Sequence, residues 1–173
     1  MIKRFARIGV SMFVKQFGWE LVPQRDVRKF LPEAYFTAFL QDNHITTVFD
    51  VGANRGQFRD MCRKAGFKGR IISFEPATDL FTNLKAKKED DVLWEIHNFA
   101  LGRKEGNQQF NLMEESVFNS FLEPSHSAVD DYLEKNVIKE KQEVKISTLD
   151  NFVRDSSIKI DLNKTLLKID TQG

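Results

Sequence analysis

Three short runs of β-branched and aromatic residues, separated by segments of helical character, constrain the fold of this chain more than any other feature. The runs cover residues 46–51, 70–74 and 92–100. The intervening segments, residues 57–65 and 78–88, have the length and composition of helices. Strands that alternate with helices through short connections form a parallel sheet covered by helices on both faces, and right-handed crossovers place the three strands in the order 3-2-1. The sequence therefore predicts an α/β fold.

The second half of the chain is expected to add further elements. They are an antiparallel strand over 108–113, a polar loop over 114–127, a helix over 128–137, a strand over 144–149 and a short helix over 149–154. The last apolar run, residues 165–170, is predicted to lie beside the run 46–51 in the parallel sheet. Thr78 or Asp79 is expected to N-cap the helix that follows the second strand.

The N-terminal part has a different pattern. We divide the chain into a helical segment, residues 1–44, and an α/β domain, residues 45–173, and expect a helix over 31–41 with Pro32 near its first turn. Residues 1–17 place apolar side chains at helical spacing with basic residues between them. Two interpretations stay open: an amphipathic helix that caps the core, or a basic helix in peripheral contact with an anionic membrane surface.

Composition excludes several classes of protein. The net charge of +1 lacks the basic excess of a nucleic-acid-binding protein, so no nucleic-acid partner is expected. No run reaches the roughly 18 apolar residues of a membrane-spanning helix. Cys62 is the only cysteine, which excludes an intrachain disulfide and fits a cytoplasmic location; we interpret it as a plain helix residue, with a reactive thiol as the alternative. The three histidines, His44, His97 and His126, show no metal-ligand spacing.

The turn after the first strand carries the main evidence for a ligand site. The segment Asp50-Val-Gly-Ala-Asn-Arg-Gly56 lies directly between a strand and a helix. Gly52 and Gly56 allow a sharp turn and the close approach of a ligand, because no Cβ stands in the way. Ligands of open α/β sheets bind beyond the carboxyl ends of the strands, where the chain order reverses. This turn is therefore the predicted centre of the site.

Three further residues end strands near that turn. Glu75 ends the second strand, where its carboxylate could accept both ribose hydroxyls of a bound nucleoside; the alternative is a surface glutamate without a role. Ala100 ends the third strand, where a small residue leaves room for an adenine ring, or where it could serve packing alone. Asp170 ends the last strand, where a carboxylate could orient or deprotonate an acceptor group, or could only cap the turn that follows.

These motifs, in this order, resemble the FkbM family of methyltransferases. The resemblance rests on five segments: Asp50-Val-Gly-Ala-Asn-Arg-Gly-Gln-Phe, Ile72-Ser-Phe-Glu-Pro76, Asn98-Phe-Ala-Leu-Gly102, Ser147-Thr-Leu-Asp150 and Leu167-Lys-Ile-Asp-Thr-Gln-Gly173. It implies a Rossmann-like class I fold, S-adenosylmethionine as cofactor, and methylation of hydroxyl groups on sugars, glycolipids or secondary metabolites. The partner would then be a small-molecule, saccharide or lipid-linked acceptor.

The resemblance also implies roles for individual residues. Those on the methionine side of the cofactor would be Asp50, Gly52, Asn54 and Gly56. Glu75 would bind the ribose and Ala100 the adenine, while Asp170 would be the catalytic residue at the methyl-transfer site. Asn119 and Ser120 fall where the family has a serine-rich stretch, but this match is loose.

The chain departs from the family in one respect. Family members continue after Asp-Thr-Gln-Gly with a helix and at least three more strands, whereas this chain stops at Gly173. The expected fold is therefore truncated after the fourth core strand, which leaves residues 165–170 as an apolar edge suited to self-association. We expect the chain alone to show no methyl transfer above background.

Two competing functions stay open. A nicotinamide-dependent oxidoreductase also has a glycine turn and an acid at the end of the second strand, but its pocket usually shows G-x-G-x-x-G, and here Asn54 stands at the middle glycine position. The second alternative is a catalytically inactive fragment or a binding remnant of a methyltransferase domain.

Overall fold

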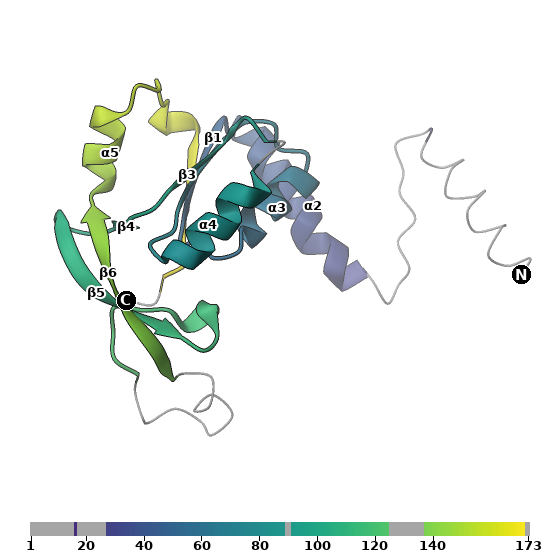
Figure 1. The fold of residues 1–173 in the computed structure, drawn as a ribbon. Helices are drawn as coiled ribbons and strands as arrows, with labels where there is room; N and C mark the ends of the chain where they lie inside the picture. Colours follow the sequence, from purple (N-terminus) through teal and green to yellow (C-terminus); the bar gives the residue numbers. More distant parts are fainter. Residues whose placement is uncertain (1–15, 17–26, 89–90, 125–136, 172–173) are drawn as a thin grey trace, which may run out of the picture.

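A four-stranded parallel sheet forms the centre of the molecule, which we describe from a computed structural model covering residues 16, 27–88, 91–124 and 137–171 (Figure 1). Its strands are β1 (Thr47–Val51), β2 (Arg70–Phe74), β3 (Trp94–His97) and β7 (Thr165–Ile169). They lie in the order β3-β2-β1-β7, and every neighbouring pair is parallel. This confirms the predicted order of the first three strands and the pairing of the last strand with the first.

Helices cover both faces of this sheet. On one face lie α2 (Val27–Asp42), α3 (Gln57–Lys64) and α4 (Thr78–Lys87), which share a core with β1, β2 and β3. The other face packs against α5 (Leu149–Asp155) through an aromatic cluster. Side chains alternate between the faces along a strand, so Val48 joins the first core and Phe49 the second.

A second, smaller sheet lies beside the first (Figure 1). Its strands are β4 (Ala100–Leu101), β5 (Gly106–Met113) and β6 (Ile138–Ser147), in the order β4-β6-β5. The expected antiparallel strand is confirmed, since β5 pairs antiparallel with β6. The expected strand over 144–149 is longer and begins at Ile138, because its partner β5 extends over eight residues. A 3-10 turn, η2 (Ser116–Phe118), follows β5.

The prediction of one continuous third strand over 92–100 is wrong. The Nδ2 group of Asn98 donates 3.0 Å hydrogen bonds to the carbonyls of Glu75 and Pro76. These bonds hold the chain at the end of β2, so β3 ends at His97 and Ala100 pairs with Ile146 in the second sheet. The break brings the second sheet to the carboxyl end of the first.

Two helix starts also differ from expectation. The helix α2 begins at Val27, which puts Pro32 in its second turn and not its first. The N-cap of α4 is Ala77 and not Thr78 or Asp79. Alanine has no side-chain acceptor for the first amides of the helix; instead the Ala77 N–H donates to Glu75 Oε1 at 3.0 Å and the Thr78 N–H to Gln142 Oε1 at 3.3 Å. The residue that caps the entry to α4 is therefore the same glutamate that was expected in the site.

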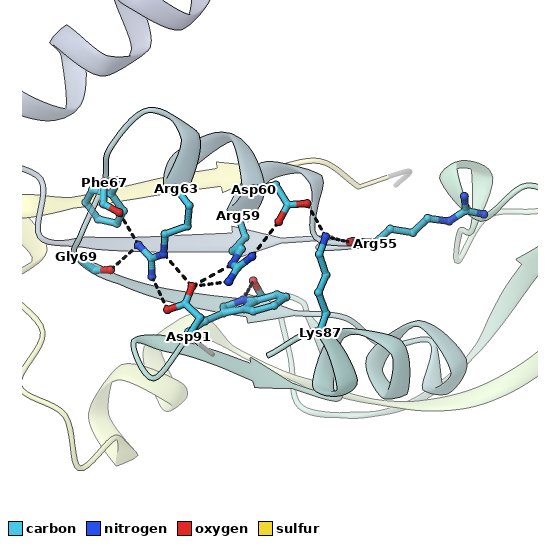
Figure 2. A network of polar contacts seen from close by, with 10 residues as sticks. Arg55, Arg59, Asp60, Arg63, Phe67, Gly69, Lys87 and Asp91 are labelled. Carbon is cyan, nitrogen blue, oxygen red and sulfur yellow. Dashed lines mark hydrogen bonds and ion pairs between the residues drawn. The ribbon is translucent and has the colours of Figure 1, made fainter. Parts of the chain in front are cut away.

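A network of arginines attaches α3 to the segment before β3 (Figure 2). Arg59 and Arg63 both reach the carboxylate of Asp91, with N–O distances of 2.8 Å. Arg63 also donates to the carbonyls of Phe67 and Gly69. Hydrogen bonds from Arg63 lower the pKa of Asp91. The position of α3, and with it the turn that precedes this helix, is thereby fixed relative to the sheet.

Cys62 lies inside α3 with its side chain fully buried. Burial raises the pKa of its thiol to about 12, so the thiolate is scarcely populated at neutral pH. This environment favours the interpretation as a plain helix residue over a reactive thiol.

Two predicted helices lie almost entirely in segments that the structure does not describe. The amphipathic segment 1–17, apart from Gln16, and the helix expected over 128–137, apart from Val137, lie outside the described residues. Among the helices that the structure does describe, none combines the length and the apolar character needed to cross a bilayer.

Candidate functional site

A cavity of 530 Å³ opens at the carboxyl ends of β1, β2 and β7, between the two sheets. Its volume lies within the range of about 300–1,000 Å³ typical of small-molecule sites. One part of the wall comes from the turn after β1 and the start of α3, and another from the ends of β2 and β7. Apolar residues of the second sheet and η2 close the remaining side. This is the edge of an open α/β sheet at which ligands bind.

The turn after β1 is built around Gly52. This residue has a φ of 74°, and a Cβ at this position would lie 2.2 Å from the carbonyl oxygen of Asp170. The N–H groups of Gly52 and Ala53 both donate to the carbonyl of Phe74. Only glycine fits here, because the turn is left-handed and the end of β7 fills the space that a side chain would need.

Asn54 connects three parts of the cavity wall. Its backbone is left-handed, with a φ of 49°, and its N–H donates to Glu75 Oε2 at 2.7 Å. Its side-chain Oδ1 accepts a 3.0 Å hydrogen bond from the hydroxyl of Ser116 in η2. The turn after β1, the end of β2 and the loop after β5 are thus held together at one residue.

Glu75 lies on the cavity wall with only 4% of its surface exposed. Burial raises the pKa of its carboxyl, and hydrogen bonds from the N–H groups of Ala77 and Asn54 act in the opposite direction. Each carboxylate oxygen accepts one of these amides, which leaves a second lone pair on each oxygen. An oriented carboxylate of this kind can accept two neighbouring hydroxyl groups.

The opposite wall is apolar and aromatic. Phe110 in β5 packs edge-on against Phe121, with ring centroids 4.8 Å apart. Ala100 and Leu101 complete this wall from β4. A flat apolar ligand group such as a purine ring fits a wall of this chemistry.

A row of buried polar groups crosses the sheet beneath the turn. Asp50 is fully buried, and its Oδ2 accepts a 3.2 Å hydrogen bond from the hydroxyl of Ser73. Its Oδ1 lies 2.9 Å from Lys168 Nζ. Lys168 also donates to the carbonyl oxygens of Gly52 and Val51, at 3.0 and 3.3 Å. Lys168 lines the cavity and is a site residue that the sequence analysis missed.

Asp170 follows β7 at the open side of the cavity. Its N–H donates to the carbonyl of Val51, while its side chain is 80% exposed and has one oxygen 3.8 Å from Lys168 Nζ. The carboxylate is therefore accessible to a second ligand that enters from solvent.

The structure brings most of the predicted site residues together. Five of them line the cavity: Gly52, Asn54, Glu75, Ala100 and Asp170. Asp50 and Gly56 do not, because Asp50 lies beneath the turn and a Cβ on Gly56 would meet Leu84 at 3.1 Å. Both residues support the turn from below. The assignment of individual residues to parts of a cofactor stays a prediction.

The loop after β5 supplies residues that sequence reasoning placed only loosely. Ser116 and Asn119 line the cavity, and Asn119 Oδ1 accepts the N–H of Met113. Ser120 is buried beside β5 and pairs with Asn111. The bond between Ser116 and Asn54 joins positions 62 apart in the sequence, and no local pattern signals it.

Sequence comparison identifies the family. The model of the methyltransferase FkbM domain matches residues 50–173, which include the turn after β1, Glu75 and Asp170. The chain belongs to the FkbM methyltransferase family. No curated protein shows significant sequence similarity to it. Among solved structures, a candidate S-adenosylmethionine dependent methyltransferase from Listeria monocytogenes has 13% identity and a TM-score of 0.30, over 70% of this chain and 80% of that chain. A likeness of that size adds nothing to the family match.

No metal centre is found in the part of the chain that the structure describes, where no three His, Cys, Asp or Glu side chains are grouped to hold an ion. The polar groups of this FkbM methyltransferase cavity are instead two carboxylates, one ammonium, and amide and hydroxyl groups.

Proposed function

We propose that this methyltransferase binds S-adenosylmethionine in the cavity and transfers its methyl group to a hydroxyl oxygen of a sugar, glycolipid or secondary metabolite. The observation that carries the proposal is Glu75, a buried carboxylate held by two backbone amides with its remaining lone pairs available at the cavity wall. A ribose diol matches this arrangement. The acceptor would be a small molecule, a saccharide or a lipid-linked compound.

The residues present fit this cofactor. The missing Cβ of Gly52 lets the end of β7 close against the turn that lines the cavity, and the wall formed by Ala100 and Phe110 suits an adenine ring. The turn fits a dinucleotide less well, because Asn54 takes the place of the middle glycine and its side chain is bonded to Ser116 across the loop.

The chemistry supplied by S-adenosylmethionine, when bound, is an electrophilic methyl group on a sulfonium. The protein's part is to hold the acceptor oxygen in line with that methyl group and to exclude water. Asp170 is placed to accept the acceptor's hydroxyl proton, because its carboxylate is exposed at the cavity's open side. Lys168 Nζ lies 3.8 Å from this carboxylate.

Methyl transfer is tested with the full chain and methyl-labelled S-adenosylmethionine against a panel of free sugars, glycolipids and phenolic metabolites. Mass spectrometry then locates the labelled methyl group. Transferred label should lie on oxygen, and in a complete version of the domain Asp170→Asn should reduce turnover far more than cofactor affinity. Absence of transferred label would bear out the expectation that this chain alone is inactive. Label on nitrogen or carbon would contradict the acceptor assignment.

The second candidate function is binding of the cofactor without catalysis. The exposed edge of β7 favours this candidate. Leu167 and Ile169 are 43% and 65% exposed at that edge. Binding of S-adenosylhomocysteine without transfer to any member of the panel would support this candidate.

A further inference from the structure

One polar row spans all four strands of the parallel sheet. Trp94 Nε1 in β3 donates to Ser73 Oγ in β2 at 2.9 Å, and the Ser73 hydroxyl donates to Asp50 Oδ2 in β1 at 3.2 Å. Asp50 Oδ1 lies 2.9 Å from Lys168 Nζ in β7. The register explains the last two contacts, since Asp50 is paired with both Ser73 and Lys168.

Each side chain in this row restricts the position of its neighbour. Asp50 is fully buried, and a buried carboxylate is tolerated only when it is paired and hydrogen-bonded. Ser73 donates a hydrogen bond to one of its oxygens, and Lys168 forms an ion pair with the other, which accepts no hydrogen bond from the described residues. The ammonium of Lys168 therefore has a fixed ionic partner on the side away from the cavity, which orients its N–H donors.

Those donors end on the turn after β1. Lys168 Nζ donates to the carbonyls of Gly52 and Val51 at 3.0 and 3.3 Å. The ammonium also lies 5.6 Å from the ring centroid of Phe58, at the start of α3. It thus connects the turn to β7 and to the helix.

Lys168 also brings a positive charge to the cavity wall. Among the described residues that line it, Lys168 is the only cation, and the two anions are Glu75 and Asp170. A ligand bound over the Gly52 turn therefore lies near a fixed positive charge.

We propose that Lys168 is a positioning residue that holds the Gly52 turn in place. Its positive charge also weakens binding of the cationic sulfonium of S-adenosylmethionine relative to the neutral thioether of S-adenosylhomocysteine. This rests on the proposed cofactor. Methyl transfer moves CH₃ from the sulfonium to the acceptor oxygen, the S–CH₃ bond electrons stay on sulfur, and the acceptor's proton leaves to a base. The sulfur thus loses its positive charge. A nearby ammonium favours that loss, because it destabilises the charged cofactor more than the neutral product.

The test compares the affinities of S-adenosylmethionine and S-adenosylhomocysteine by calorimetry in four proteins. They are the wild type, Lys168→Met, Lys168→Arg, and Lys68→Met as the matched control at an exposed position. In Lys168→Met the ratio of the two dissociation constants should shift about fivefold or more in favour of the sulfonium. Lys168→Arg and Lys68→Met should keep the wild-type ratio.

Lys168→Met leaves Asp50 buried without its cation, so the double variant Asp50→Asn/Lys168→Met is included in case the single variant does not fold. Lys168 lines the cavity and Asp50 lies beneath it, so loss of the nearer charge should dominate, and the ratio should still shift at least twofold in the same direction. Amide exchange of residues 52–54 should be faster in the Lys168→Met or double variant than in the control, because their brace is gone.

The outcomes separate the two proposals. A wild type that binds neither compound would contradict the proposed cofactor. A wild type that binds both, with an unchanged ratio and unchanged exchange in a folded Lys168 variant, would overturn the role of Lys168 and leave the cofactor assignment intact.

Discussion

The carbonyl oxygen of Asp170 occupies the space that a side chain on residue 52 would need. A Cβ on Gly52 would lie 2.2 Å from that oxygen, and the N–H of Asp170 donates to the carbonyl of Val51 at 3.1 Å. The turn after β1 and the end of β7 therefore interlock. The two candidate ligand-binding segments cannot move independently, so changes in one should affect the other.

Gly52→Ala should destabilise the fold through both strain and collision. A non-glycine residue in the left-handed region costs about 1–3 kcal/mol, and the collision with Asp170 adds to this. Gly66→Ala is a matched control, because Gly66 also has a positive φ, of 80°, but nothing lies within 4 Å of its Cβ position. Urea unfolding should show the larger loss for Gly52→Ala. Equal losses would mean that the backbone at Asp170 moves away from a Cβ on residue 52 without a loss of stability.

Glu75→Ala should weaken both folding and cofactor binding. Its carboxylate accepts the N–H groups of Asn54 and Ala77, and leaving such buried donors unpaired costs about 1–3 kcal/mol. Loss of hydrogen bonds to a ribose diol should weaken S-adenosylhomocysteine binding by about 1.5–3 kcal/mol. Urea unfolding and calorimetry on the same preparation separate the two effects. Reduced stability with unchanged affinity would show that Glu75 only caps α4.

The pH dependence of stability should carry a signature of His97. Its ring lies against Phe74 and Phe152, with centroid distances of 5.6 and 4.8 Å, and burial lowers its pKa below 6.5. Because the folded pKa is below the unfolded value, the unfolded state takes up the proton first. The free energy of unfolding should therefore be unaffected by His97 above about pH 6.5. It should decrease as the pH is lowered from there to the pKa of the folded state, by at most about 1.4 kcal/mol per pH unit for one proton.

His97→Phe provides the comparison for this pH dependence. Phenylalanine fits the aromatic cluster and does not titrate, so the variant's stability should vary less with pH between 6.5 and 5. Urea unfolding at a series of pH values measures both proteins. Parallel curves would show that other groups produce the dependence.

The general fold could be predicted because its signals are local. Strand runs, the Gly52 turn and the acid at Glu75 each lie within a few residues, and the crossover rule then sets the strand order. The division of the third strand was missed because it depends on Asn98 bonding to the end of β2, a contact across 22 and 23 residues.

Lys168 was missed for a related reason. A lysine inside an apolar strand gives no sign of the group opposite, and only the register of β1 with β7 places it beside Asp50. Conversely, Asp50 and Gly56 were expected on the cavity wall because they belong to the motif. Alternation along β1 directs Asp50 beneath the turn, and Gly56 begins α3 against Leu84 and Trp94.

The outer edge of β7 should promote self-association. Within the described residues β7 is paired only with β1, and Ile169 is 65% exposed. A lysine on an edge strand opposes pairing with another chain, so Ile169→Lys should lower the association constant in sedimentation experiments. Val92→Lys, at a position that is 86% exposed elsewhere, should have no such effect. Identical sedimentation of both variants and the wild type would exclude this edge as the contact.

The cofactor assignment is the central claim, and direct titration of the full chain with S-adenosylhomocysteine and with NAD tests it. The account predicts that S-adenosylhomocysteine binds at least tenfold more tightly than NAD, because Asn54 and its bond to Ser116 narrow the turn where a pyrophosphate would lie. Tighter binding of NAD, or no binding of S-adenosylhomocysteine to the folded protein, would contradict it.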